Sequence, residues 1–198
     1  MTGRALPRIC VFCGSSAGRD PRFRESAEGL ARTLVARGQG LVFGGGSVGL
    51  MGVVADAVLE AGGEAIGVIP HGLAAREVAH RGLADLRVVS SMHARKALMA
   101  ELADGFVALP GGYGTFEELF EMVTWAQLGI HRKPVGLLNV AGYFDHLARF
   151  LDRAVAEGFV TAANRGLVVV EDDPGRLLDR LNVHRLPAGP EWITSDEA

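Results

Sequence analysis

The chain has 198 residues, of which 48% are hydrophobic and 22% are charged, and its formal net charge is -3. These values fit one compact domain with a sizeable core. No basic stripe is apparent, so neither nucleic acid nor an anionic membrane surface is expected as a partner. Because the sequence shows no bilayer-spanning apolar stretch and no signal-peptide pattern, we expect a cytoplasmic protein.

Apolar runs typical of buried strands alternate along the chain with segments typical of helices. Strands are predicted at residues 8–12, 40–43, 64–69, 86–90, 105–109, 134–139 and 167–170. Helices are predicted at residues 22–37, 48–61, 92–102, 116–128, 144–157 and 175–181. This alternation predicts an α/β fold, a single Rossmann-like domain with a doubly wound parallel sheet. We expect the domain to cover residues 8–186, between a flexible N-terminus (1–7) and a mobile C-terminal tail (187–198).

Three glycine-rich loops follow predicted strands, at residues 14–16, 44–47 and 111–114. In a doubly wound fold, loops at the carboxyl ends of the strands converge on one crevice. None of the three matches the dinucleotide fingerprint in its required context, and none is a Walker A loop with its lysine. A mononucleotide or another phosphorylated ligand therefore fits better than NAD or ATP.

The most informative segment is Leu109-Pro-Gly-Gly-Tyr-Gly-Thr-Phe-Glu-Glu118, where an apolar strand turns through glycines into a helix. Such a turn presents unpaired backbone N–H groups at the positive end of a helix dipole, which favours phosphate. Glu117, Glu118 and Glu121 follow within about one helical turn. Because carboxylates repel phosphate, these side chains either face away from it or act on another part of the ligand.

Simpler interpretations exist for several of these residues. Thr115 and Glu118 have the spacing of a capping box, with Thr115 as N-cap. Glu121 is expected to be a solvated helix residue, and Arg95 taken alone would be a surface cation. Cys10 and Cys13 form a Cys-x-x-Cys pair, but strand positions i and i+3 point to opposite faces, so we expect reduced structural thiols. No histidine or cysteine spacing indicates a metal site.

Six segments together carry a resemblance to a known family. They are Cys13–Ser16, Gly44–Gly52, Gly67–Pro70, Met92–Lys96, Pro110–Glu118 and Gln127–His131. They resemble the LOG (LONELY GUY) family of cytokinin riboside 5'-monophosphate phosphoribohydrolases, which are often mislabelled lysine decarboxylases. The resemblance extends from about residue 8 to about residue 170, and the Pro-Gly-Gly-x-Gly-Thr-x-x-Glu element is its most specific part.

The resemblance implies two catalytic residues, Arg95 and Glu118. It also implies a set of substrate contacts at Glu77, Lys96, Gly111, Gly112, Tyr113, Gly114, Thr115, Phe116, Glu117 and Thr124. We expect Gly14, Ser15, Gly45 and Met92 to line the same site. The resemblance also implies a homodimer, which agrees with the large apolar residues on the two site helices. These residues are Met92, Leu98, Met99, Phe120, Met122 and Trp125.

The residue chemistry agrees with the implied reaction, hydrolysis of an N-glycosidic bond without a cofactor. Its transition state resembles a ribosyl oxocarbenium ion, which a carboxylate such as Glu118 can stabilise. A pyridoxal-phosphate decarboxylase would need a Schiff-base lysine, and the chain has only Lys96 and Lys133. The alternative function is a non-catalytic carrier of a nucleotide or of molybdenum cofactor with the same fold.

Overall fold

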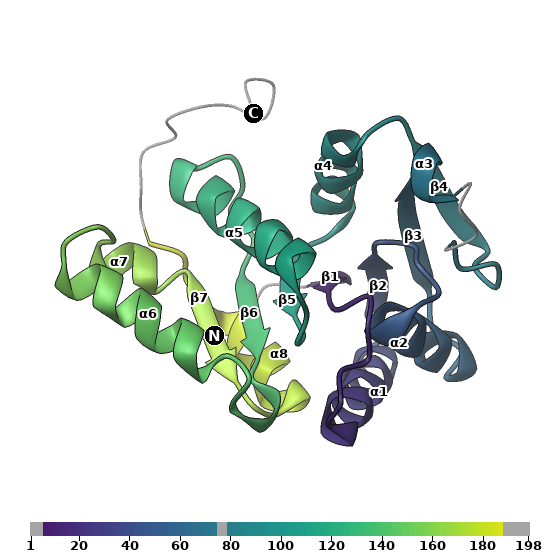
Figure 1. Cartoon of the computed structure of the whole chain (residues 1–198), viewed down its shortest axis with the longest axis horizontal. Helices are drawn as coiled ribbons and strands as arrows, with labels where there is room; N and C mark the ends of the chain where they lie inside the picture. The colour runs from purple at the N-terminus through teal and green to yellow at the C-terminus, as the bar shows by residue number, and fades with distance from the viewer. Residues whose placement is uncertain (1–5, 75–78, 188–198) are drawn as a thin grey trace.

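The computed structural model describes residues 6–74 and 79–187. Seven parallel strands form one sheet in the order β4-β3-β2-β1-β5-β6-β7 (Figure 1). Their bounds are Arg8–Phe12 (β1), Gly40–Phe43 (β2), Ala65–Pro70 (β3), Asp85–Val89 (β4), Gly105–Ala108 (β5), Val135–Leu138 (β6) and Val168–Glu171 (β7). The predicted single-domain, Rossmann-like α/β fold is confirmed.

The helices lie between the strands, as predicted, with two short additions. Their bounds are Pro21–Ala36 (α1), Gly49–Glu60 (α2), His71–Ala74 (α3), Met92–Leu102 (α4), Tyr113–Leu128 (α5), Asp145–Ala156 (α6), Ala162–Arg165 (α7) and Pro174–Val183 (α8), and a 3₁₀ turn covers Val140–Gly142 (η1). The short helices α3 and α7 were not predicted, because four residues make barely one turn and show no periodicity.

The core has two layers, one on each face of the sheet. Ile9 and Val11 of β1 pack with residues of α1, α2 and α8 on one face. Cys10 and Phe12 pack with residues of α4 and α5 on the other face. This alternation follows from the two-residue period of a strand. Figure 1 shows the same division, with α4 and α5 on one side of the sheet and α1, α2 and α8 on the other.

The two cysteines follow the same alternation and confirm the prediction of opposite faces. Cys10 belongs to the layer beneath α4 and α5, and Cys13 belongs to the layer beneath α1 and α2. Both thiols are free and buried. Burial raises the pKa of each thiol well above its usual range. Both are therefore protonated at neutral pH, as expected of structural cysteines.

The sheet order places two glycine loops next to each other at a topological switch point. Strand β1 pairs with β2 on one side and with β5 on the other. The chain winds in opposite directions from this pair, so the loops after β1 and β5 leave a crevice between them.

Before β1, Leu6 is buried and its carbonyl accepts a hydrogen bond from Gln39. Among the described residues, no helix is long and apolar enough to cross a membrane.

Candidate active site

The turn between β5 and α5 leaves the start of the helix open. Helix α5 begins at Tyr113, with Gly112 as its N-cap and no side-chain cap hydrogen bond. The predicted capping box is therefore wrong, because Thr115 and Glu118 both lie inside the helix. The helix begins three residues earlier than predicted, since the two glycines make the turn themselves. The first backbone N–H groups of α5 lack acceptors within the helix and can bind an anion.

A hollow of about 270 Å³ lies at this turn. It is lined by Gly14, Ser15, Ser16, Ala17, Gly18, Phe23, Leu50, Pro110, Gly111, Gly112 and Tyr143. The loops after β1 and β5 touch here, because the Gly14 N–H donates to the Pro110 carbonyl at 3.0 Å. A Cβ atom on Gly111 would lie 2.1 Å from Oγ1 of Thr115. Only glycine fits at this close approach.

Arg95 and Glu118 form a buried ion pair between α4 and α5. Nη1 of Arg95 lies 3.2 Å from Oε1 of Glu118, and the two side chains are only 9% and 11% exposed. The guanidinium also donates to two backbone carbonyls, from Nε to Val68 within β3 at 3.0 Å and from Nη2 to Gly44, directly after β2, at 3.2 Å. Arg95 is therefore held by β2, β3 and α5 together, and it is not the surface cation expected of an isolated helix arginine.

Burial gives Glu118 an unusual pKa. Desolvation raises the pKa of Glu118 from 4.5 to about 7, although the neighbouring Arg95 guanidinium opposes the rise. The charges of Glu117 and Glu121 raise this pKa further, and the Lys96 ammonium lowers it. A carboxyl group with a pKa near 7 exchanges its proton at physiological pH, which is typical of catalytic acids and bases.

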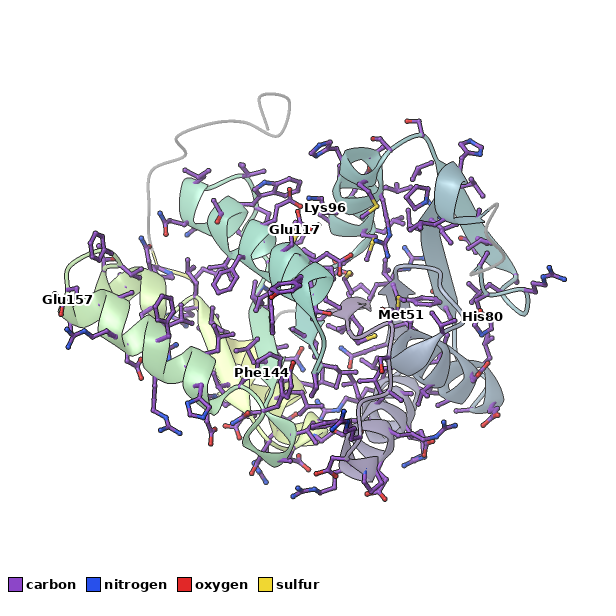
Figure 2. All side chains as sticks on the ribbon, in the orientation of Figure 1. Met51, His80, Lys96, Glu117, Phe144 and Glu157 are labelled. Atoms are coloured by element: carbon purple, nitrogen blue, oxygen red, sulfur yellow. The ribbon has the colours of Figure 1, made fainter. Side chains whose placement is uncertain are left out.

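A second charged cluster lies beside this pair. Nζ of Lys96 on α4 contacts Oε1 of Glu117 and lies 3.0 Å from Oε1 of Glu121, both on α5. Figure 2 shows Lys96 and Glu117 pointing toward each other across the gap between the two helices. The other oxygen of Glu121, Oε2, is buried without a hydrogen-bond partner. The expectation of a solvated Glu121 is therefore wrong.

The carboxylates behind the glycine turn thus face away from the expected phosphate. Glu117 and Glu121 bind Lys96, and Glu118 binds Arg95, so all three side chains point toward cations of α4. This arrangement resolves the conflict between a phosphate site and three nearby acids. It also leaves one negative charge in excess when all five groups are ionised, and the raised pKa of Glu118 agrees with that excess.

The structure gathers part of the predicted substrate set around the hollow. Gly14, Ser15, Gly111 and Gly112 line it. Three others lie close by in the first turn of α5: Tyr113 and Gly114 are exposed, whereas Thr115 is buried against Gly111. The roles of these residues in binding stay predictions.

Other predicted contacts lie elsewhere. Gly45 is buried against β3 and β4, where its φ of 70° suits glycine. Met92 is half exposed, with its sulfur 4.0 Å from Nη1 of Arg95. Phe116 packs against the layer beneath α4 and α5. The hydroxyl of Thr124 donates to a carbonyl of its own helix, outside the hollow. Glu77 lies outside the described residues.

Two features of the site were not predicted. Gly44 packs so tightly against Arg95 that a Cβ atom there would lie 1.7 Å from Nη2. Tyr143 reaches the hollow from the loop after β6, and its hydroxyl donates to the Gly111 carbonyl at 2.5 Å. No local pattern could have shown either contact, because the partners lie 51 and 32 residues apart in the chain.

Within the described residues, no cluster of histidine, cysteine, aspartate or glutamate could hold a metal ion.

Known proteins are similar to this chain over most of its length. The family described as "Possible lysine decarboxylase" matches residues 51–181. The probable cytokinin riboside 5'-monophosphate phosphoribohydrolase LOGL3 of Oryza sativa subsp. japonica is 51% identical over 192 residues, which cover 94% of this chain and 91% of that protein. The cytokinin riboside 5'-monophosphate phosphoribohydrolase LOG2 of Arabidopsis thaliana is 53% identical over 187 residues, with coverage of 94% and 87%.

Solved structures show the same fold at lower identity. The molybdenum cofactor carrier protein MCP from Chlamydomonas reinhardtii matches with a TM-score of 0.67 and 25% identity, over 88% of this chain and 96% of that one. The molybdenum cofactor binding protein from Rippkaea orientalis matches with a TM-score of 0.66 and 20% identity, over 88% and 94% of the two chains. Since the curated relatives share about half of their residues with nearly the whole chain, the protein belongs to the LOG family of cytokinin riboside 5'-monophosphate phosphoribohydrolases.

Proposed function

We propose that this protein hydrolyses the N-glycosidic bond of adenosine 5'-monophosphates, including those modified at N6, and releases the free base and ribose 5-phosphate. The observation that carries the proposal is that α5 has an open, glycine-lined N-terminus and also carries Glu118, in a buried ion pair with Arg95. The N-terminus suits a phosphate, and the pair suits a carboxylate that meets a ribosyl cation. The names of the curated relatives describe the same reaction class.

The phosphate positions the substrate. Its oxygens accept hydrogen bonds from the first N–H groups of α5, and the dipole of the helix favours its charge. Glu118 follows Gly112 by six residues, which places it about 9 Å along the same helix. Because one rigid helix carries both the phosphate site and the carboxylate, anchoring the phosphate fixes C1' relative to Glu118. The binding energy of the phosphate is then used to position the reacting atom.

Glu118 acts in its ionised form. As the bond from C1' to the base nitrogen breaks, the base leaves with the electron pair and positive charge develops on the ribose. The Glu118 carboxylate stabilises this charge and orients the water that attacks C1'. It can accept a proton from that water and pass it to the base anion, which gives the free base and restores the carboxylate. Arg95 favours the ionised form of the buried carboxylate and holds it in place, because its guanidinium is fixed by the carbonyls of Gly44 and Val68.

The two lysines do not fit a pyridoxal-phosphate decarboxylase. Lys96 lies between the carboxylates of Glu117 and Glu121, and hydrogen bonds to these two acids outweigh the opposing effect of burial and raise its pKa. Nζ of Lys133 donates to the Ala100 carbonyl at 2.6 Å. A Schiff-base lysine must be able to lose its proton and reach a cofactor carbonyl. Neither residue is placed for this chemistry.

We also propose that the protein acts as a homodimer in the cytoplasm. Met92, Leu98, Phe120 and Trp125 are half-buried or exposed on α4 and α5, and a second subunit would cover them. Met99 and Met122, which were expected to contribute, are already buried within the protomer. The two free thiols are compatible with a reducing compartment. Light scattering at micromolar concentration and cell fractionation test these two points.

A simple incubation tests the proposed reaction. The purified protein is mixed separately with AMP, with isopentenyladenosine 5'-monophosphate and with the two matching ribosides, and free base and ribose 5-phosphate are quantified. We expect base release from the monophosphates and little from the ribosides, because the phosphate anchors the ribose. Comparable turnover of the ribosides would contradict the anchor. Tight binding of a monophosphate without base release would favour a carrier instead.

A further inference from the structure

Three successive carbonyls in the turn between β5 and α5 are each held by a different donor. The Pro110 carbonyl accepts from the Gly14 N–H at 3.0 Å, and the Gly112 carbonyl accepts from the Phe116 N–H at 3.1 Å. Between them, the Gly111 carbonyl accepts from the Tyr143 hydroxyl at 2.5 Å. Two of these donors are backbone groups, and the third is a side chain.

The geometry of the peptide bond gives these contacts a consequence for anion binding. In a trans peptide the C=O of one residue and the N–H of the next lie in one plane and point in opposite directions. A donor that fixes the Gly111 carbonyl therefore also fixes the direction of the Gly112 N–H. Because this peptide lies between two glycines, its rotation meets little steric resistance without such a contact.

Two aromatic neighbours orient the ring of Tyr143, which is 39% exposed. Its ring packs edge-on against Phe23 of α1, with ring centroids 5.7 Å apart, and against Phe144 at 5.0 Å. The chain reaches Tyr143 through Ala141 and Gly142, whose φ angles are 55° and 72°. The left-handed conformation is unfavourable for alanine and persists only where the surroundings enforce it. The loop after β6 thus turns sharply and directs the phenol toward Gly111.

We propose that Tyr143 is a positioning residue for the phosphate of the substrate: by holding the Gly111 carbonyl, it directs the Gly112 N–H into the anion site. Tyr143 acts through the peptide and not by its own contact with the reacting atoms. The ligand assigned here, the phosphate monoester of a nucleotide, rests on the proposed function. The orientation of the peptide does not, so the two ideas can be tested separately.

The test compares Tyr143→Phe with the wild-type protein by calorimetry, with ribose 5-phosphate and with adenine as probes. The variant keeps the ring and its packing but loses the hydroxyl. We expect the Kd for ribose 5-phosphate to rise about 3- to 10-fold, the effect of one hydrogen bond. The Kd for adenine should stay within a factor of about two, because adenine has no phosphate. A merely structural role would weaken both ligands alike.

Thr33→Val is the matched control. The Thr33 hydroxyl also donates to a backbone carbonyl, that of Gly29 at 2.7 Å, but within α1 and outside the hollow. We expect this variant to bind ribose 5-phosphate like the wild type. As a second measurement, the amide resonance of Gly112 should shift when ribose 5-phosphate binds to the wild type and shift less in Tyr143→Phe.

The outcomes separate the inference from the proposed function. An unchanged Kd for ribose 5-phosphate and an unchanged Gly112 shift in Tyr143→Phe would overturn the role of Tyr143, even if the wild type cleaves nucleotides. A higher Kd for ribose 5-phosphate and a smaller shift of the Gly112 amide resonance in Tyr143→Phe would support the role of Tyr143, even if no nucleotide is cleaved. In that second case only the proposed hydrolysis would fail.

Discussion

The guanidinium of Arg95 occupies the space that a side chain on Gly44 would need. A Cβ atom on Gly44 would lie 1.7 Å from Nη2 and 2.9 Å from Cζ of Arg95. The glycine therefore permits the close approach that lets Arg95 reach the Gly44 carbonyl and, on its other side, Glu118. The second glycine loop serves the ion pair in this way, in addition to any contact with a ligand.

This relationship predicts the effect of Gly44→Ala. The added methyl group must displace the guanidinium, so Arg95 loses its hold on the carbonyl and on Glu118. We expect kcat to fall at least about 10-fold, the effect of one misplaced charged contact. Gly72→Ala is the control, since nothing lies within 4 Å of a Cβ atom there. Equal activities of the two variants in a base-release assay would show that the close approach does not matter.

Burial of Glu118 predicts a pH dependence of folding stability. The folded protein keeps the Glu118 proton up to about pH 7, whereas an unperturbed glutamate loses it near 4.5. The contribution of this group to stability is therefore largest below about pH 4.5 and falls as the pH rises toward 7. The loss between pH 5 and pH 8 amounts to roughly 2–3 kcal/mol.

Glu118→Gln should remove this loss, because glutamine does not titrate. Urea unfolding gives the free energy of unfolding at pH 5 and at pH 8. We expect the difference between the two values to be smaller in Glu118→Gln than in the wild type. Glu157→Gln, at an exposed carboxylate paired with Arg153 on α6, is the control. Parallel stability curves for the wild type and Glu118→Gln would contradict a raised Glu118 pKa.

The Lys96 cluster predicts opposite shifts of the catalytic pH profile. If ionised Glu118 is the active form, kcat rises with pH through an apparent pKa of about 7. Lys96→Met removes a cation, so the profile should move to higher pH. Glu121→Gln removes an anion, so it should move to lower pH. Lys133→Met removes a lysine that contacts the Ala100 carbonyl and serves as the control. Shifts in the same direction for both variants would refute the electrostatic coupling.

The sequence was sufficient for the fold because its signals are local. The apolar runs 40–43 and 105–109 are each followed directly by glycine or proline, and the alternation of such runs with helical segments predicts the strands and the long helices. The capping box was misleading for a related reason. Thr115 and Glu118 have the right spacing, but the conformation of Gly112 decides where α5 begins.

The environment of the site residues could not be predicted from local patterns. The buried Arg95 donates to the carbonyls of Gly44, directly after β2, and of Val68, within β3, which lie 51 and 27 residues away in the chain. Glu121 is drawn out of solvent by Lys96, 25 residues earlier. Such contacts depend on the sheet order, which brings distant loops together. The Glu117–Glu121 spacing of four residues could at most indicate a shared helix face.

The most direct test of the central claim is kcat of Glu118→Gln on the best nucleoside monophosphate, with thermal unfolding measured on the same preparation. Glutamine keeps the size of the side chain and can still accept a hydrogen bond from Arg95, but it carries no charge. If the Glu118 carboxylate acts at C1', kcat of Glu118→Gln should be about 10²- to 10⁴-fold lower than that of the wild type, and the variant should still fold. Turnover close to that of the wild type would show that Glu118 only holds Arg95, and the account of catalysis would be wrong.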